Sequence, residues 1–276
     1  MSGGNIHFGE KLARTFVAWS FIAVISLPMA WMLASAFKTP EDILRPDFLP
    51  RQLSLENFQK LFAGEFFTWF GNSLIVAGIS VPLVIFLGTL AAYSMTRFTY
   101  PGRSGIAVAV LFTYMFPSTL MLVPLFLIVA DLGLNGTYWA LVLANTTFAL
   151  PFAVWLLRSY FLGVPPEVEE AAMVDGASRL SAFVQVVLPQ VMPGIISTSV
   201  FAFIQAWDEY MFASIFASGS EMMTLPVGVA RYSDELNADW GVLMAASVCS
   251  TLPVVVLFAF MQRKLLPDLN AGAVKQ

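Results

Sequence analysis

Long apolar stretches, each free of lysine and arginine, alternate along this chain with shorter polar segments. A helix needs roughly 20 apolar residues to cross the about 30 Å of hydrocarbon in a bilayer, and six stretches reach that length. They predict an all-α integral membrane protein with six transmembrane helices, at residues 15–37, 71–96, 105–130, 138–157, 194–216 and 241–262.

The first of these stretches has a second interpretation. Lys11 and Arg14 precede it, and Ala34-Ser35-Ala36 resembles the cleavage site of a secretory signal peptide. Because its apolar part is longer than the roughly 7 to 15 residues typical of secretory signals, we expect an uncleaved membrane anchor.

The basic residues predict the orientation of the chain. A cytoplasmic N-terminus places nine of them inside and five outside, which agrees with the tendency of lysine and arginine to remain in the cytoplasm. The inside set is Lys11, Arg14, Arg97, Arg103, Arg158, Arg179, Arg263, Lys264 and Lys275, and the outside set is Lys38, Arg45, Arg51, Lys60 and Arg231. Both termini, including the tail 263–276, are then cytoplasmic.

Two segments are expected on the external side. Residues 38–70 combine prolines with apolar residues, a pattern typical of an extended piece followed by an amphipathic helix that begins near Ser54. Residues 217–240 are expected to form a flexible acidic segment, with Gly219, Pro226 and Gly228 among the acidic side chains Glu221, Asp234, Glu235 and Asp239. The second segment could reach a partner outside the membrane.

A polar segment, residues 165–193, interrupts the apolar pattern on the cytoplasmic side. Pro165, Pro166 and an acidic first turn predict the start of a helix, and Asp175-Gly176 predicts its end. Ser178 suits the N-cap of a second helix that runs towards Pro189. The resulting helix-turn-helix is either an amphipathic connector on the membrane surface or a docking element.

Composition excludes several functional classes. Of the 276 residues, 58% are hydrophobic and 12% are charged, the mean hydropathy is +0.76, and no basic patch suits nucleic acid. A single cysteine, Cys249, and a single histidine, His7, provide no internal disulfide and no transition-metal cluster. The chain also lacks a phosphate-binding glycine-rich loop and a nucleophile with its base. We therefore expect no catalytic residue, no metal, no cofactor and no ATP hydrolysis in this chain.

The fifth apolar stretch contains the most unusual polar residues. Asp208 and Glu209 lie within it, and helical spacing would place them on one side with Gln205, flanked by Trp207 and Tyr210. Buried carboxylates are costly in lipid, so these should face an aqueous path, a partner or one another. Hydrogen-bonding groups beside aromatic rings suit a sugar. Alternatively, the two acids only hold a bend between helices.

The third and fourth stretches supply further candidates. Tyr114 and the segment Phe116–Thr119, with Pro124, predict a kinked third helix. Asn145 places an amide deep in the fourth helix. Such groups line a path or, more often, hold helices together.

The polar segment resembles a known signature. Glu170-Ala171-Ala172, three residues, Gly176, nine residues, Val186, one residue and Leu188-Pro189 match the cytoplasmic coupling loop of permease subunits in binding-protein-dependent ABC importers, with valine where isoleucine is usual. In that family the loop inserts into a cleft of the ATPase subunit. The resemblance therefore implies that ATPase coupling depends on Glu170, Ala171, Ala172, Asp175, Gly176, Leu188 and Pro189.

The resemblance extends over nearly the whole chain and is greatest for the carbohydrate-uptake branch, in particular the smaller, maltose-transporter-type permease. It implies a single permease domain, residues 1–276, whose external loop contacts the binding protein, and we single out Glu221, Pro226 and Tyr232 there. It also implies that the C-terminal tail reaches the ATPase through Gly272, Val274 and Lys275, although the chain ends in Gln276 where glycine is common.

The expected function follows from this resemblance. The chain would move a sugar, polyol or glycoside across the bacterial inner membrane by alternating access. Its partners would be a second homologous permease, two copies of an ABC ATPase that bind ATP and Mg, an extracytoplasmic solute-binding protein and the lipid membrane. Import of a non-carbohydrate solute is the alternative within transport. An ATPase-independent channel or membrane scaffold is the alternative from a different class.

Overall fold

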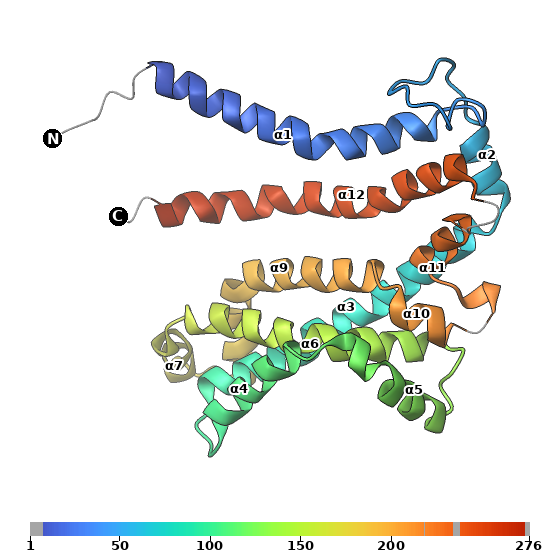
Figure 1. Ribbon diagram of the computed structural model, residues 1–276. Helices are drawn as coiled ribbons and strands as arrows, with labels where there is room; N and C mark the ends of the chain where they lie inside the picture. The colour runs from blue at the N-terminus through green and yellow to red at the C-terminus, as the bar shows by residue number, and fades with distance from the viewer. Residues whose placement is uncertain (1–7, 218, 234–237, 274–276) are drawn as a thin grey trace. The chain divides into compact units, whose positions relative to one another are not determined.

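The computed structural model describes the backbone of residues 8–217, 219–233 and 238–273, and the side chains of residues 10–217, 219–233 and 238–261. Within these ranges the chain is helical and contains no strand (Figure 1). It divides into two compact units, Met1–Phe66 with Val229–Thr251 and Phe67–Gly228 with Leu252–Gln276. The all-α prediction is thereby confirmed.

Five described helical segments are long and apolar enough to cross a membrane, and there are six if a bent helix pair is counted as one span. These spans are Glu10–Ala36, Phe66–Arg97, Arg103–Tyr114 with Ser118–Asp131, Tyr138–Leu162, Arg179–Trp207 and Trp240–Met261. Each overlaps one of the six stretches predicted from the sequence.

The first unit contains α1 (Phe8–Ala36), α2 (Glu56–Ala63), a short 3₁₀ turn (Arg231–Ser233) and the start of α12 (Trp240–Ala273). The Ser54 hydroxyl accepts a hydrogen bond from the Glu56 N–H (3.1 Å), so the amphipathic helix begins where the sequence predicted. The buried Asn57 amide donates to the Ala36 and Lys38 carbonyls (3.0 and 2.8 Å). A Cβ at Gly241 would overlap that amide, so α12 approaches α2 closely.

The second unit contains most of the remaining helices. In chain order these are α3 (Phe66–Arg97), α4 (Arg103–Tyr114), a 3₁₀ turn (Ser118–Met121), α5 (Leu122–Asp131), α6 (Tyr138–Leu162), α7 (Pro166–Val174), α8 (Arg179–Ala182), a π-helical turn (Phe183–Val187), α9 (Leu188–Trp207), α10 (Met211–Phe216), a 3₁₀ turn (Ser220–Met222) and α11 (Leu225–Ala230).

Helix α6 lies at the centre of this unit, packed against α4, α9 and α10 (Figure 1). Small residues permit the close approach: Ala149 and Ala153 of α6 are buried with Val84 of α3 and Ala202 of α9. Apolar helices gain little from leaving lipid, so this kind of van der Waals contact supplies much of their association.

Two predicted spans differ markedly from the observed helices. The stretch 105–130 is not one helix, because α4 and the segment Ser118–Asp131 meet at an angle of 93°. Pro117, at this break, lacks the N–H that would continue the hydrogen-bond ladder. The predicted kink is therefore confirmed as a sharp break.

The fifth span was predicted at 194–216, and its limits are wrong at both ends. The helical segment begins at Arg179, runs through Pro189 and Pro193, and ends at Trp207. Thus the second arm of the predicted helix-turn-helix is continuous with the membrane span. The predicted helical spacing of Asp208 and Glu209 fails because both residues follow the end of α9.

Candidate functional site

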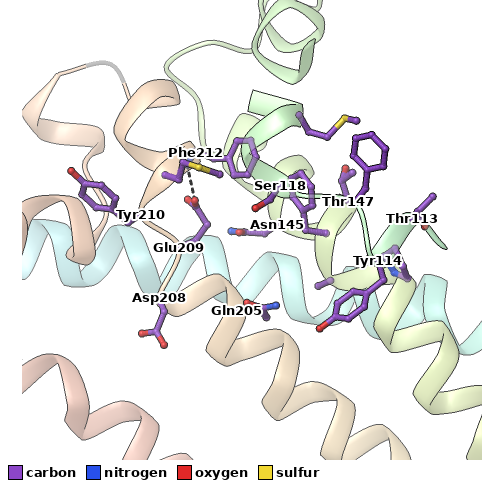
Figure 2. A pocket seen from close by; sticks show the side chains of 16 residues that line it. Thr113, Tyr114, Ser118, Asn145, Thr147, Gln205, Asp208, Glu209, Tyr210 and Phe212 are labelled. Carbon is purple, nitrogen blue, oxygen red and sulfur yellow. Dashed lines mark hydrogen bonds between the residues drawn. The ribbon is translucent and has the colours of Figure 1, made fainter. Parts of the chain in front are cut away.

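A cavity of about 780 Å³ lies within the second unit (Figure 2). It is bordered by the two places where helices break, at the end of α4 and between α9 and α10, and by the middle of α6. Six of the seven residues predicted for the substrate path line it: Tyr114, Asn145, Gln205, Asp208, Glu209 and Tyr210. The structure thus brings together residues from three separate apolar stretches.

Glu209 holds the start of α10. Its two carboxylate oxygens accept hydrogen bonds from the N–H groups of Phe212 (2.6 Å) and Ala213 (2.8 Å). The first N–H groups of a helix have no partner in the helix, and a carboxylate also favours the positive end of the helix dipole. Glu209 therefore holds the bend between helices, as the second interpretation of the sequence expected, by capping α10.

Asp208 differs from its neighbour. It is exposed and forms no side-chain hydrogen bond or ion pair with the described residues. Gln205, one helical turn earlier, likewise lines the cavity with an exposed side chain. In this break one acid stabilises the backbone and the other remains available to a partner or a solute.

Helix α6 and α4 supply the opposite wall. Asn145 is buried at 8% exposure, and the Thr147 hydroxyl donates back to the Leu143 carbonyl (2.7 Å). The ring of Tyr114 lies 5.3 Å from that of Phe152. No lysine, arginine or histidine lines the cavity among the described residues. Hydroxyls, amides, carboxylates and aromatic faces make this wall suitable for a hydroxyl-rich, uncharged solute.

Trp207 does not line the cavity. Its side chain is 2% exposed, and its ring packs against Phe70 and Phe203, both at 5.4 Å between ring centres. A tryptophan at the last position of α9 is thus a packing residue, whereas helical spacing alone had placed it beside the path.

The polar segment forms the predicted helix-turn-helix. Pro166 is the first residue of α7, Gly176 adopts a left-handed φ of 95°, and Ser178 accepts from the Ser181 N–H (3.2 Å). Its surface combines polar and apolar groups, because Val174 and Leu180 are 87% and 72% exposed. The residues singled out there divide into exposed Glu170, Ala171, Asp175, Gly176 and Pro189, and half-buried Ala172 and Leu188.

A buried polar cluster that the sequence did not indicate attaches this segment to α3. The Arg97 Nε lies 3.0 Å from the Glu169 Oε2, with side chains 7% and 5% exposed. Arg97 also donates to the Val164 carbonyl (2.8 Å), and the Tyr93 hydroxyl donates to Glu169. Arg97 and Glu169 lie 72 residues apart, so no local spacing pattern could reveal their contact.

The candidate external contacts fall in different parts of the fold. Glu221 is exposed in the turn Ser220–Met222, and Pro226 lies in α11, both in the second unit. Tyr232 lies in the first unit, where burial raises the pKa of its hydroxyl and the nearby carboxylates of Asp239 and Glu65 raise it further.

The three C-terminal candidates lie at or beyond the end of the described residues. Gly272 belongs to the backbone of α12, which continues to Ala273 where a polar tail from residue 263 was expected. Val274 and Lys275 lie outside the described residues.

Comparison with known proteins identifies the class. Residues 84–270 match the family described as binding-protein-dependent transport system inner membrane component. The chain is 40% identical to the inner membrane ABC transporter permease protein YcjP of Escherichia coli, over 92% of this chain and 93% of that protein. It is 35% identical to the diacetylchitobiose uptake system permease protein DasC of Streptomyces coelicolor, over 97% and 98%.

Solved structures share the fold. A chain of the bacterial ABC transporter involved in the import of the acidic polysaccharide alginate superposes with a TM-score of 0.80, at 20% identity, over 92% of this chain and 95% of that chain. This protein is a multi-pass membrane permease. It belongs to the family of binding-protein-dependent transport system inner membrane components.

Proposed function

We propose that this chain is a permease subunit of an ATP-driven importer that moves a neutral sugar, polyol or glycoside across the bacterial inner membrane by alternating access. Relatives named for diacetylchitobiose uptake and for trehalose/maltose transport support the carbohydrate class; the latter, from Thermococcus litoralis, is 34% identical over 92% of this chain. The wall of hydroxyl, amide and aromatic groups around the cavity supports it independently.

The helix-turn-helix 166–182 is the proposed contact with the ATPase, and it is the observation on which the proposal depends. Two apolar side chains, Val174 and Leu180, are exposed on a polar helix pair that continues directly into a membrane span. The small Ala171 and the open left-handed turn at Gly176 permit a close approach of another surface. Closure of two ATPase copies on ATP and Mg would then push α9 as a rigid body.

The remaining assignments follow from this orientation. The helix-turn-helix and both termini would be cytoplasmic, and Gly272, Val274 and Lys275 would lie near the ATPase. The segment with Glu221 and Pro226, together with Tyr232, would face an extracytoplasmic solute-binding protein. A solved alginate transporter of similar fold, in complex with its substrate-bound periplasmic protein, superposes with a TM-score of 0.68. A second permease would complete the path beside Gln205, Asp208, Glu209, Tyr210, Tyr114 and Asn145.

The test is ATP hydrolysis by the reconstituted complex. The chain is combined with the second permease, ATPase and binding protein encoded by neighbouring reading frames, and a panel of sugars, polyols and amino acids is added. Glu170→Lys and Gly176→Asp should abolish stimulation by the loaded binding protein while the subunits still assemble. Gly102→Asp is the control, because Gly102 also has a left-handed φ (82°) and open space around it, and it lies just before α4.

Each outcome discriminates between the candidate functions. Stimulation by a sugar-loaded binding protein supports the proposal and names the substrate class. Stimulation only by an amino acid would show a non-carbohydrate importer. If no ATPase co-purifies with the chain, a channel or scaffold replaces the importer.

A further inference from the structure

One end of α3 holds the external segment 221–228. The Asn72 amide donates to two carbonyls of that segment, those of Glu221 and Met223, both at 2.8 Å. The carbonyl oxygen of the same amide accepts from the Tyr138 hydroxyl of α6, also at 2.8 Å. Asn72 is 4% exposed, so these contacts are shielded from water.

Two neighbours of Asn72 complete this attachment. The buried Ser73 hydroxyl accepts from the Leu225 N–H at 2.8 Å. Gly228 lies directly on the indole of Trp69, where a Cβ would overlap the ring. Four positions of the external segment, at Glu221, Met223, Leu225 and Gly228, are thus fixed to the first two turns of α3.

The other end of α3 holds both arms of the helix-turn-helix. Tyr93 and Arg97 bond Glu169 of α7, as described above. The Tyr93 ring also packs on Phe183, in the second arm, at 4.4 Å between ring centres. Val187 and Val191, further along that arm, are buried in the same cluster.

The helix between these two attachments is long and well packed. With 32 residues it extends about 48 Å, which exceeds the about 30 Å of hydrocarbon in a bilayer. Its middle is buried through Val76, Val84 and Ala92, and Gly88 is in close contact with Leu157 and Ala153 of α6. Packing along both halves supports motion as one element, although Pro82 lies inside the helix and removes one of its backbone hydrogen bonds.

We propose that α3 links the two faces of the transporter: Asn72 and Ser73 position the external segment, Tyr93 and Arg97 position the helix-turn-helix, and displacement of either segment moves the other. The inference rests on the proposed function, in which these segments meet the binding protein and the ATPase. Because coupling between two sites is reciprocal, the same linkage serves signals in both directions.

The test uses the assembled transporter with its binding protein. Tyr93→Phe removes one hydroxyl, and Asn72→Ala removes the amide at the other end. Each should lower the stimulation of ATP hydrolysis by loaded binding protein about 2- to 30-fold, the range found when residues along a coupled network are changed. Uptake per ATP should fall as well, whereas the amount of assembled complex should remain the same.

Two matched controls are available. Tyr100→Phe is the control for Tyr93→Phe, because the Tyr100 hydroxyl has no partner among the described residues. Asn135→Ala is the control for Asn72→Ala, because Asn135 is exposed between α5 and α6. Both should leave stimulation within about twofold, a difference below roughly 0.5 kcal/mol. Ser73→Ala replaces Asn72→Ala if the latter does not assemble.

The double variant distinguishes a linkage from two local effects. If α3 carries the signal, the combined loss in Tyr93→Phe with Asn72→Ala should be clearly smaller than the product of the two single losses, because residues that act through one shared element are not additive. Multiplied losses, or losses equal to the controls, would overturn the inference. A failure of the unsubstituted complex to respond to its binding protein would overturn the proposed function itself, and this inference with it.

Discussion

Arg97 and Glu169 form an ion pair at 3.0 Å that is buried on both sides, although the two residues belong to different helices and lie far apart in the sequence. The guanidinium also donates a hydrogen bond to the Val164 carbonyl, and the carboxylate accepts one from the Tyr93 hydroxyl. Both charges therefore have additional hydrogen-bonding partners, which a buried ion pair requires if it is not to destabilise the fold.

Removal of one member of this pair should be costly. Glu169→Ala leaves the Arg97 charge buried without its carboxylate, and we expect a loss of about 3 to 5 kcal/mol in the free energy of unfolding. A large fall in the thermal midpoint of the purified protein would show this. Glu167→Ala changes an exposed glutamate of the same helix and should leave the midpoint unchanged. An equal effect of both changes would contradict the structural role of the pair.

Any side chain at Gly176 should strain the turn between α7 and α8. No atom lies within 4 Å of the position a Cβ would take, so the penalty of Gly176→Ala comes from the left-handed φ of 95° alone. That penalty is about 1 to 2 kcal/mol. Hydrogen exchange of the amides in 166–182 should accelerate. Gly105→Ala, in helix α4 with equal space, is the control; faster exchange there too would point to a cause other than the turn.

Substitution should distinguish the roles of Asp208 and Glu209, the two acids at the break between α9 and α10. Glu209→Ala deprives the Phe212 and Ala213 N–H groups of their acceptor, and loss of such a cap costs about 0.5 to 2 kcal/mol. Asp208→Asn removes a charge that has no described partner, so it should alter uptake without lowering the thermal midpoint. Measuring both quantities for both variants checks this, and a destabilised Asp208→Asn protein would disprove the division of roles.

The close contact between α9 and α6 should depend on the absence of a side chain at Gly194. A Cβ there would overlap the ring of Tyr160, whereas a Cβ at Gly78 would meet no atom within 4 Å. Gly194→Ala should therefore destabilise the protein by about 1 to 3 kcal/mol, the usual cost of overpacking. Gly78→Ala should be neutral. Thermal unfolding in one detergent compares the two, and similar midpoints would show that Tyr160 can move aside.

The sequence was informative about the spans because apolar length is a strong and local signal. Each of the six predicted stretches overlaps a helix, or for 105–130 a bent helix pair, that is long and apolar enough to cross a membrane. The helix-turn-helix was also predictable, since proline, glycine and serine have position-specific roles at helix ends. Gly176 and Ser178 take the conformations expected of them.

Helix breaks and long-range pairs were less predictable. Proline alone did not mark the breaks: α9 passes through Pro189 and Pro193, yet it ends at Trp207 with no proline nearby. Glu209, two residues after that end, caps the next helix through the N–H groups of Phe212 and Ala213. The contacts of Arg97 with Glu169 and of Asn72 with Glu221 join distant segments. The periodicity of apolar residues along one segment does not reveal such pairs.

The cavity lies between two short interruptions, at Met115–Pro117 and Asp208–Tyr210, and several of their side chains are exposed, among them Phe116 and Tyr210. None of the residues at the two interruptions belongs to the described buried clusters, although Ala149 and Phe212 of those clusters also line the cavity. Apart from Glu209, which caps α10, the exposed residues of the interruptions are therefore less constrained by folding than the buried clusters. Over evolutionary time, descendants of one ancestral gene can acquire new solutes by exchanging these few exposed residues while inheriting the scaffold intact.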